Sequence, residues 1–201
     1  MRSSFRCIRC GRRYQPGTTL RCGCGGLLEV EHEFPSVDRA FFDGRIGSPS
    51  HIYGSGVWRF KEIVYPDLEE SHIVTRPEGN TGLYLRRPLA EYVGVRRLAL
   101  KHEGENPTGS FKDRGMTVGV SEALRLGASV VACASTGNTS SSLAAYAAQA
   151  GLNCLVFIPE GKIAYGKLAQ TLAYGARVLQ IRGNFDDAMR IVQQASDVMG
   201  F

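Results

Sequence analysis

Lys112 stands between a run of turn-forming residues and an expected helix, an arrangement that could support chemistry. The segment Asn106–Gly115 reads Asn-Pro-Thr-Gly-Ser-Phe-Lys-Asp-Arg-Gly, and it follows a strand-like run at 97–101. Pro107 disfavours helix at the preceding residue and helps to end that strand, and the Thr-Gly-Ser after it favours a turn. The helix dipole disfavours a protonated amine at a helix start, and an uncharged lysine amine can form a Schiff base with an aldehyde. Taken alone, Lys112 also fits a plain surface helix.

A second polar loop, Ser135-Thr136-Gly137-Asn138-Thr139-Ser140, follows an apolar run and opens another expected helix. Backbone N–H groups at a helix start hold anions, and ligands of open α/β sheets gather at the carboxyl ends of strands. An ordinary capped helix start explains this loop equally well when it is considered by itself. Its pairing with Lys112 favours a site for a small anionic ligand.

The segment around Lys112 resembles the lysine motif of the fold-type II pyridoxal-phosphate enzymes. Asn-Pro-Thr-Gly-Ser is shared with cysteine synthases, and Phe-Lys-Asp-Arg-Gly is most similar to threonine synthases. The resemblance runs from about Trp58 to Phe201. It includes Glu78-Gly79-Asn80-Thr81-Gly82-Leu83, in which Gly82 replaces the usual proline of the family and is expected to loosen the local backbone.

This resemblance implies a role for each site residue. Lys112 would carry pyridoxal phosphate as a Schiff base and act as acid and base, and Asn138 would bond the 3-hydroxyl of the pyridine ring. The substrate's carboxylate or phosphate would meet the hydroxyl and N–H groups of four loop residues, Ser135, Thr136, Gly137 and Thr139. In a threonine synthase the substrate is O-phosphohomoserine and the products are threonine and phosphate. Two alternative activities remain open, a cysteate synthase, which acts on phosphoserine, and another lyase of this fold.

Helix-like and strand-like segments alternate after Lys112. Helices are expected at Arg114–Leu126, Asn138–Ala150, Ile163–Tyr174 and Phe185–Met199, and strands at Ser129–Ala134, Cys154–Ile158 and Arg177–Ile181. Short apolar strands between helices predict an α/β fold with an open parallel sheet covered by helices on both faces. The resemblance implies a small domain at 101–201 that carries the lysine, and a linker with part of the large domain at 35–100.

Four cysteines lie within eighteen residues of the N-terminal segment, as Cys7-x-x-Cys10 and Cys22-x-Cys24. Thiolates are soft ligands that suit tetrahedral zinc, so residues 1–34 predict a zinc-ribbon-like head with one structural zinc, closed by a strand at Leu27–Phe34. The second pair has one intervening residue where two are usual. Four reduced cysteines without a metal therefore remain an alternative, and a disulfide is disfavoured in a reducing compartment.

The composition favours a globular protein of the cytoplasm. The chain is 43% hydrophobic and 21% charged, without an apolar run that would span a membrane or a secretory signal. Its net charge is +5, and part of this charge lies in the head. The basic residues there are Arg2, Arg6, Arg9, Arg12 and Arg13. A ribbon that binds nucleic acid is a weaker alternative, because it leaves the Lys112 and Asn138 loops unexplained.

Two parts of the family's site have no counterpart in this sequence. The resemblance implies a glycine-rich loop for the cofactor phosphate and a Ser or Thr at the pyridine nitrogen, both downstream of the region that matches Phe185–Met199. We therefore expect a truncated chain or half of a split enzyme that is inactive alone and associates with a missing C-terminal half or with itself. A non-catalytic fragment is the alternative.

Overall fold

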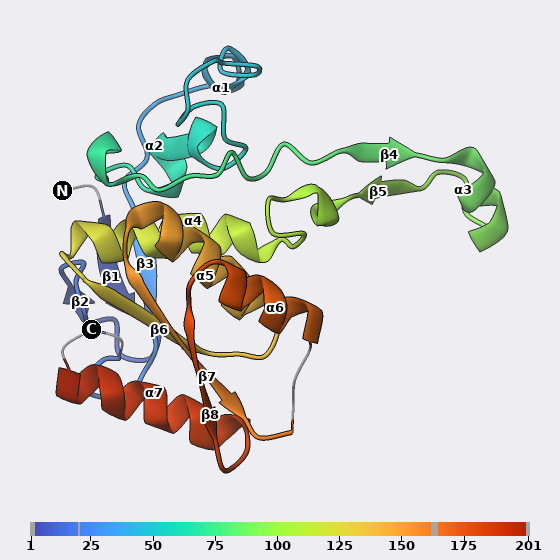
Figure 1. Ribbon diagram of the computed structural model, residues 1–201. Helices are drawn as coiled ribbons and strands as arrows, with labels where there is room; N and C mark the ends of the chain where they lie inside the picture. The colour runs from blue at the N-terminus through green and yellow to red at the C-terminus, as the bar shows by residue number, and fades with distance from the viewer. Residues whose placement is uncertain (1–2, 20, 162–164, 200–201) are drawn as a thin grey trace. The chain divides into compact units, whose positions relative to one another are not determined.

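A computed structural model describes residues 3–19, 21–161 and 165–199 (Figure 1). The chain divides into two compact units, Met1–Ile73 and Val74–Phe201. The boundaries predicted after residues 34 and 100 fall inside these units, and they stay predictions. None of the helices in the described part of the chain is both long and apolar enough to cross a membrane.

A three-stranded parallel sheet forms the centre of the Val74–Phe201 unit. Its strands are β6 (Val130–Ala134), β7 (Asn153–Pro159) and β8 (Arg177–Ile181), in the order β6-β7-β8. Val130 lies beside Asn153 at the start of β6 and β7, and Arg177, the first residue of β8, lies beside Leu155, so β8 is shifted by two residues along the sheet. The expected parallel sheet is confirmed, and its central strand β7 is apolar and mostly buried from Cys154 to Pro159, as expected where helices cover both faces.

Four helices cover this sheet. They are α4 (Lys112–Arg125), α5 (Asn138–Ala150) and α6 (Tyr165–Ala173) on one face, and α7 (Phe185–Met199) on the other (Figure 1). The predicted cover on both faces is thus confirmed. The helix expected from Ile163 begins at Tyr165 in the described residues, and its first two expected positions lie outside them.

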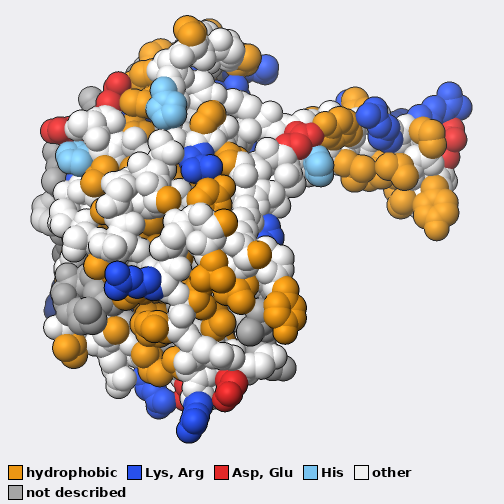
Figure 2. Space-filling view, viewed as in Figure 1, with side chains coloured by type: hydrophobic (Ala, Val, Ile, Leu, Met, Phe, Trp, Pro, Cys, Tyr) orange, Lys and Arg blue, Asp and Glu red, His pale blue; other side chains and the backbone are white. Residues whose placement is uncertain are grey.

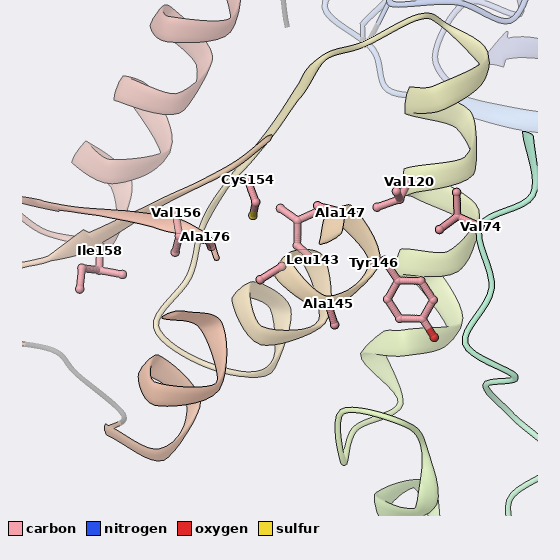
Figure 3. Close-up of a cluster of buried hydrophobic side chains, with 11 residues drawn as sticks. Val74, Val120, Leu143, Ala145, Tyr146, Ala147, Cys154, Val156, Ile158 and Ala176 are labelled. Atoms are coloured by element: carbon pink, nitrogen blue, oxygen red, sulfur yellow. The ribbon is translucent and has the colours of Figure 1, made fainter. Parts of the chain in front are cut away.

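The main core lies between the sheet and the alanine-rich face of α5 (Figure 3). Ala144, Ala145 and Ala147 are fully buried, and such small side chains let the helix approach closely. Tyr146 is buried among them. A smaller cluster around Phe157 packs α7 against the opposite face. These two clusters hold the strand ends, where the candidate site lies, in fixed positions.

The two remaining cysteines of the sequence lie in the central sheet, as expected of small core residues. Cys154 is buried on β7 and Cys133 is half-buried on β6. Burial raises the pKa of the Cys133 thiol to about 12, with a smaller contribution from Cys154. Burial likewise raises the pKa of the Cys154 thiol to about 12. Both thiols therefore stay protonated and act as apolar groups.

An arm precedes the lysine loop and extends from the rest of its unit (Figure 1). It consists of β4 (Leu83–Leu85), α3 (Arg87–Val93) and β5 (Ala99–Lys101), with β4 and β5 antiparallel. Apolar side chains gather on it (Figure 2), among them Tyr92, which is 90% exposed. The prediction that Pro107 helps to end this strand was wrong. β5 stops at Lys101, and a 3-10 turn, η3 (Glu103–Glu105), separates it from Pro107.

The Met1–Ile73 unit begins with a small antiparallel sheet of order β2-β1-β3. Its strands are β1 (Ser3–Cys7), β2 (Arg13–Tyr14) and β3 (Leu28–His32), and β3 confirms the strand expected there. The short elements after it are α1 (Arg39–Asp43), η1 (Trp58–Phe60), α2 (Lys61–Val64) and η2 (Glu70–His72). The run from Trp58 to Val64 thus forms a 3-10 turn followed by one α-turn. Trp58 is fully buried, and it anchors this part of the unit.

Candidate functional site

Lys112 is the first residue of α4, which begins two residues before the helix start expected at Arg114. Gly109 has a φ of +77°, a left-handed conformation that favours glycine, and its N–H donates to the carbonyl of Asn106 at 2.7 Å. The Lys112 N–H donates to Ser110 Oγ at 3.2 Å. The Lys112 amine lies 4.8 Å from the ring centroid of Phe111, and the residue is half-buried. The turn therefore places a primary amine at the mouth of a helix.

Asp113 fixes the start of α4 against α5. Its carboxylate is fully buried and accepts bonds from the Thr108 N–H at 2.7 Å and the Thr108 hydroxyl at 2.6 Å. It also accepts a bond from the Ser142 hydroxyl at 2.5 Å. Ser142 follows Asn138 by one helical turn and shares its face of α5. The structure thus brings the lysine loop to the beginning of the helix that the second loop opens.

The second loop borders a small hollow at the carboxyl end of the sheet. Its lining residues are Ser135, Thr136, Ser140, Val156, Ile158, Leu168 and Thr171. Two of the predicted substrate-binding residues, Ser135 and Thr136, are therefore brought together. Gly137, Asn138 and Thr139 lie on the adjacent helix start, with Asn138 exposed. A Cβ on Gly137 would meet no atom within 4 Å, so space is open beside this backbone.

Helix α6 is a third part of the site, which sequence reasoning missed. Lys167 Nζ donates to the carbonyl of Thr108 at 3.0 Å and to Gln170 Oε1 at 3.3 Å. One turn later, the Thr171 hydroxyl lies 3.5 Å from the Ser140 hydroxyl. The same helix therefore contacts both loops. No local pattern could have revealed this, because Lys167 and Thr108 lie far apart along the chain.

A polar network joins the 78–82 segment to the lysine loop. Arg114 donates to both oxygens of Glu103, at 2.7 and 2.9 Å, and Thr81 Oγ1 donates to Glu103 at 2.9 Å. The bond from Arg114, followed by those from Thr81 and Asn106, lowers the pKa of Glu103 to about 2. The Asn106 side-chain oxygen accepts from the Gly79 N–H at 2.9 Å. Asn106 therefore connects the lysine loop to the 78–82 segment.

Gly82 has a definite role in the structure. Its N–H donates to Glu105 Oε2 at 2.5 Å, a bond that a proline at this position could not make. A Cβ built on Gly82 would approach the Tyr84 ring to 2.6 Å. This glycine thus adds a hydrogen bond between the arm and η3, and the expectation that it loosens the backbone stays a prediction.

Glu78, the first residue of the segment that resembles the family, is fully buried. The Tyr146 hydroxyl donates to its carboxylate at 2.7 Å, and the Thr75 hydroxyl donates at 3.0 Å. Burial, followed by the charge of Glu78, raises the pKa of Tyr146. This pair ties the segment to the middle of α5. The segment that begins at Glu78 is thus fixed to the core through this buried carboxylate.

In the head, the four thiols of Cys7, Cys10, Cys22 and Cys24 meet, with all sulfur atoms within 4.8 Å of one another. The Cys7–Cys24 and Cys10–Cys22 Sγ distances are 3.6 and 3.5 Å. Tetrahedral zinc with bonds of about 2.3 Å requires edges of about 3.8 Å between its sulfur ligands. The four thiols thus have the spacing of a tetrahedral metal site.

Backbone and side-chain groups surround these thiols. A Cβ on Gly26 would lie 2.6 Å from Cys7 Sγ, so only glycine fits there without a shift. The Tyr14 hydroxyl donates to Cys22 Sγ at 3.0 Å. The backbone N–H of Cys24 and this hydroxyl lower the pKa of Cys22 to about 6. These groups favour a thiolate at Cys22, the form that binds metal ions.

Residues 74–199 match the family described as pyridoxal-phosphate dependent enzyme. The chain belongs to this family. It is 50% identical over 190 residues to a threonine synthase of Methanocaldococcus jannaschii, a match that covers 94% of this chain and 46% of the relative. A threonine synthase of Methanosarcina acetivorans is 48% identical over 191 residues, which cover 94% of this chain and 45% of that protein. This family member thus spans less than half the length of these curated relatives.

Solved structures share the fold. Diaminopropionate ammonia lyase of Escherichia coli superposes with a TM-score of 0.57 at 21% identity, covering 65% of this chain and 40% of that enzyme. The processed form of threonine deaminase isoform 2 from Solanum lycopersicum gives a TM-score of 0.55 at 21% identity, over 84% of this chain and 41% of that one. The pyridoxal-phosphate family member therefore has the fold-type II architecture expected from its sequence.

The residues present in this family member fit pyridoxal phosphate. The cofactor's aldehyde needs a primary amine, and Lys112 presents one at a helix start beside its Phe111 ring. The start of α5 offers backbone N–H groups, an amide side chain at Asn138 and open space at Gly137. The small hollow nearby has four hydroxyl-bearing residues in its wall. The roles of the individual residues stay predictions.

Proposed function

We propose that the protein containing this chain is a threonine synthase, which converts O-phosphohomoserine and water to threonine and phosphate. The observation that carries the proposal is the junction of Lys112 with the start of α5 through Asp113 and Ser142. Two threonine synthases that are 50% and 48% identical over 94% of the chain support the same assignment. The cytoplasmic location and a homo-oligomeric state or a missing C-terminal half also stay predictions.

Each of the site residues of this chain has its own role in the proposed reaction. Bound pyridoxal phosphate supplies an electron sink for the carbanion at the substrate's α-carbon. The Lys112 amine holds the cofactor and then takes and returns protons at the substrate carbons, because it is already within reach. Asn138 would bond the ring hydroxyl of the cofactor, while Asp113 keeps the lysine loop in place. The substrate's anionic groups bind to the second loop, at Ser135, Thr136, Gly137 and Thr139.

The experiment is a chimera in which this chain replaces the matching segment of the Methanocaldococcus jannaschii threonine synthase. Release of threonine and phosphate is measured with O-phosphohomoserine, and phosphoserine is the competing substrate. We expect turnover of O-phosphohomoserine, with a Lys112→Ala chimera as the inactive control. A folded chimera that binds the cofactor but prefers phosphoserine would replace the assignment with the cysteate synthase alternative.

We also propose one structural zinc ion at the four head cysteines. The spacing of the four thiols and the backbone of Gly26 against Cys7 Sγ support it. Metal analysis of the purified chain should give one zinc per chain. The Cys10→Ser variant should lose it, whereas Cys133→Ser, which changes a core thiol of the other unit, should retain it. Four freely titratable thiols in a folded, metal-free protein would refute the proposal.

A further inference from the structure

Thr108, four residues before Lys112, is held from two sides. Its N–H and hydroxyl both donate to Asp113, and its carbonyl accepts from Lys167 of α6. Every polar group of Thr108 thus has a partner. Residues 106–111 lie between η3 and α4, so such bonds, rather than a helix or strand ladder, determine the shape of the loop.

Lys167 has unusual partners for a half-buried lysine. Its two hydrogen-bond acceptors are the Thr108 carbonyl and Gln170 Oε1, both uncharged, and no ion pair forms at Lys167 within the described part of the chain. A bond from a charged donor to a carbonyl is stronger than one between neutral groups. The Lys167 amine therefore stabilises the loop that contains Thr108, and it does not neutralise a carboxylate of the described residues.

The position of Lys167 also links the two halves of the site. Leu168 and Thr171 on the same helix line the hollow beside the second loop, and Thr171 contacts Ser140. A displacement of α6 would therefore change both the lysine loop and the wall of the hollow. A Cβ on Gly109, next to Thr108, would lie 3.8 Å from Lys167 Nζ, an ordinary van der Waals contact, so glycine is favoured here by its φ of +77°.

We propose that Lys167 is a positioning residue for Lys112, acting through the Thr108 carbonyl to hold the loop that directs the Lys112 amine. This inference rests on the proposed role of Lys112 as the cofactor-binding residue. It differs from a general contribution to stability, because the loop should lose its order while the rest of the unit stays folded.

The test compares Lys167→Met and Lys167→Arg in the 201-residue chain. Lys61→Met is the matched control, since Lys61 donates to the carbonyl of Pro66 at 3.2 Å in the other unit. Amide hydrogen exchange at Thr108, Gly109 and Lys112 is measured without cofactor. We expect Lys167→Met to accelerate exchange about tenfold, as the loss of one charged hydrogen bond implies. Lys167→Arg should restore slow exchange, and Lys61→Met should leave it unchanged.

A second readout is the rate at which pyridoxal phosphate and borohydride label Lys112, measured by mass spectrometry. Lys167→Met should slow this labelling severalfold at an unchanged Tm, and Lys167→Arg should recover it. Lys167→Gln replaces the methionine variant if the latter does not fold. Unchanged exchange and labelling in a folded neutral variant would overturn the proposal. If Lys167→Met accelerates exchange but Lys112 is not labelled in the parent chain or in any variant, the proposed role of Lys112 is refuted. The contact between Lys167 and the loop would still stand.

Discussion

The head brings four thiols to one point, while the Val74–Phe201 unit distributes its site over the starts of three helices. Within the described part of residues 3–34, the fully buried positions are Ser3, Cys7, Cys22 and Gly26, of which only the thiols carry a sizeable side chain. The other unit has an extended apolar core under its site. A small module without such a core would depend on the proposed zinc ion, whereas the lysine loop lies on a unit with a buried apolar core.

Removal of the zinc ion proposed for the head should have the largest effect and should distinguish the two regions. Structural zinc supplies about 10–16 kcal/mol of apparent binding energy in zinc-finger peptides, so a chelator or Cys22→Ser should unfold the head. Hydrogen exchange should then become fast in β1 and β3 and stay slow in β6 and β7. Protection in β1 that survives both treatments would show that the head folds by packing alone.

The second prediction concerns the core beneath the lysine site. Tyr146→Phe removes the hydroxyl that donates to the buried carboxylate of Glu78, which should lower the free energy of unfolding by about 2 kcal/mol. Denaturant unfolding measures this loss. Tyr92→Phe is the control, since Tyr92 is 90% exposed on the arm and should change the stability little. Equal effects of the two variants would contradict the assigned core contact.

The smallest expected effect concerns Glu103, whose pKa lies near 2 because of Arg114. A lowered pKa stabilises the fold above the carboxyl's ordinary value of 4.5, and this stability is lost as the pH falls toward about 2. Both side chains are about a third exposed, so the pair contributes only about 1 kcal/mol. Glu103→Gln should remove this contribution to the free energy of unfolding at pH 7. The variant should also lose less stability than the parent chain as the pH falls, which denaturant unfolding at several pH values measures. An unchanged acid profile in this variant would contradict the role of Glu103.

Local signals allowed most of the fold to be predicted. The bounds of α5, β8 and α7 agree with the sequence, since Gly151 and the Asn184 turn mark the ends of regular apolar patterns. The prediction that Pro107 helps to end the preceding strand failed because the chain has an additional turn, η3, between them. The hydrogen bonds of Glu103 stabilise this turn. Such a network depends on contacts between distant segments.

The candidate site shows the same division between local and distant signals. Lys112 and the second loop have recognisable local sequences, and the structure places both at helix starts. Asp113 is adjacent to Lys112, yet its partner Ser142 is 29 residues away. Lys167 contacts Thr108 from a helix 59 residues further along. These partners are chosen by tertiary packing, so no motif within the sequence could indicate them.

The central claim is that Lys112 is the lysine that holds the cofactor. The most direct measurement treats the chimera with pyridoxal phosphate and borohydride and locates the covalent label by mass spectrometry. The label should lie on Lys112, and Lys112→Ala should abolish it without unfolding the protein. A label distributed over Lys101 and Lys61, or one that persists in Lys112→Ala at the same level, would contradict the claim.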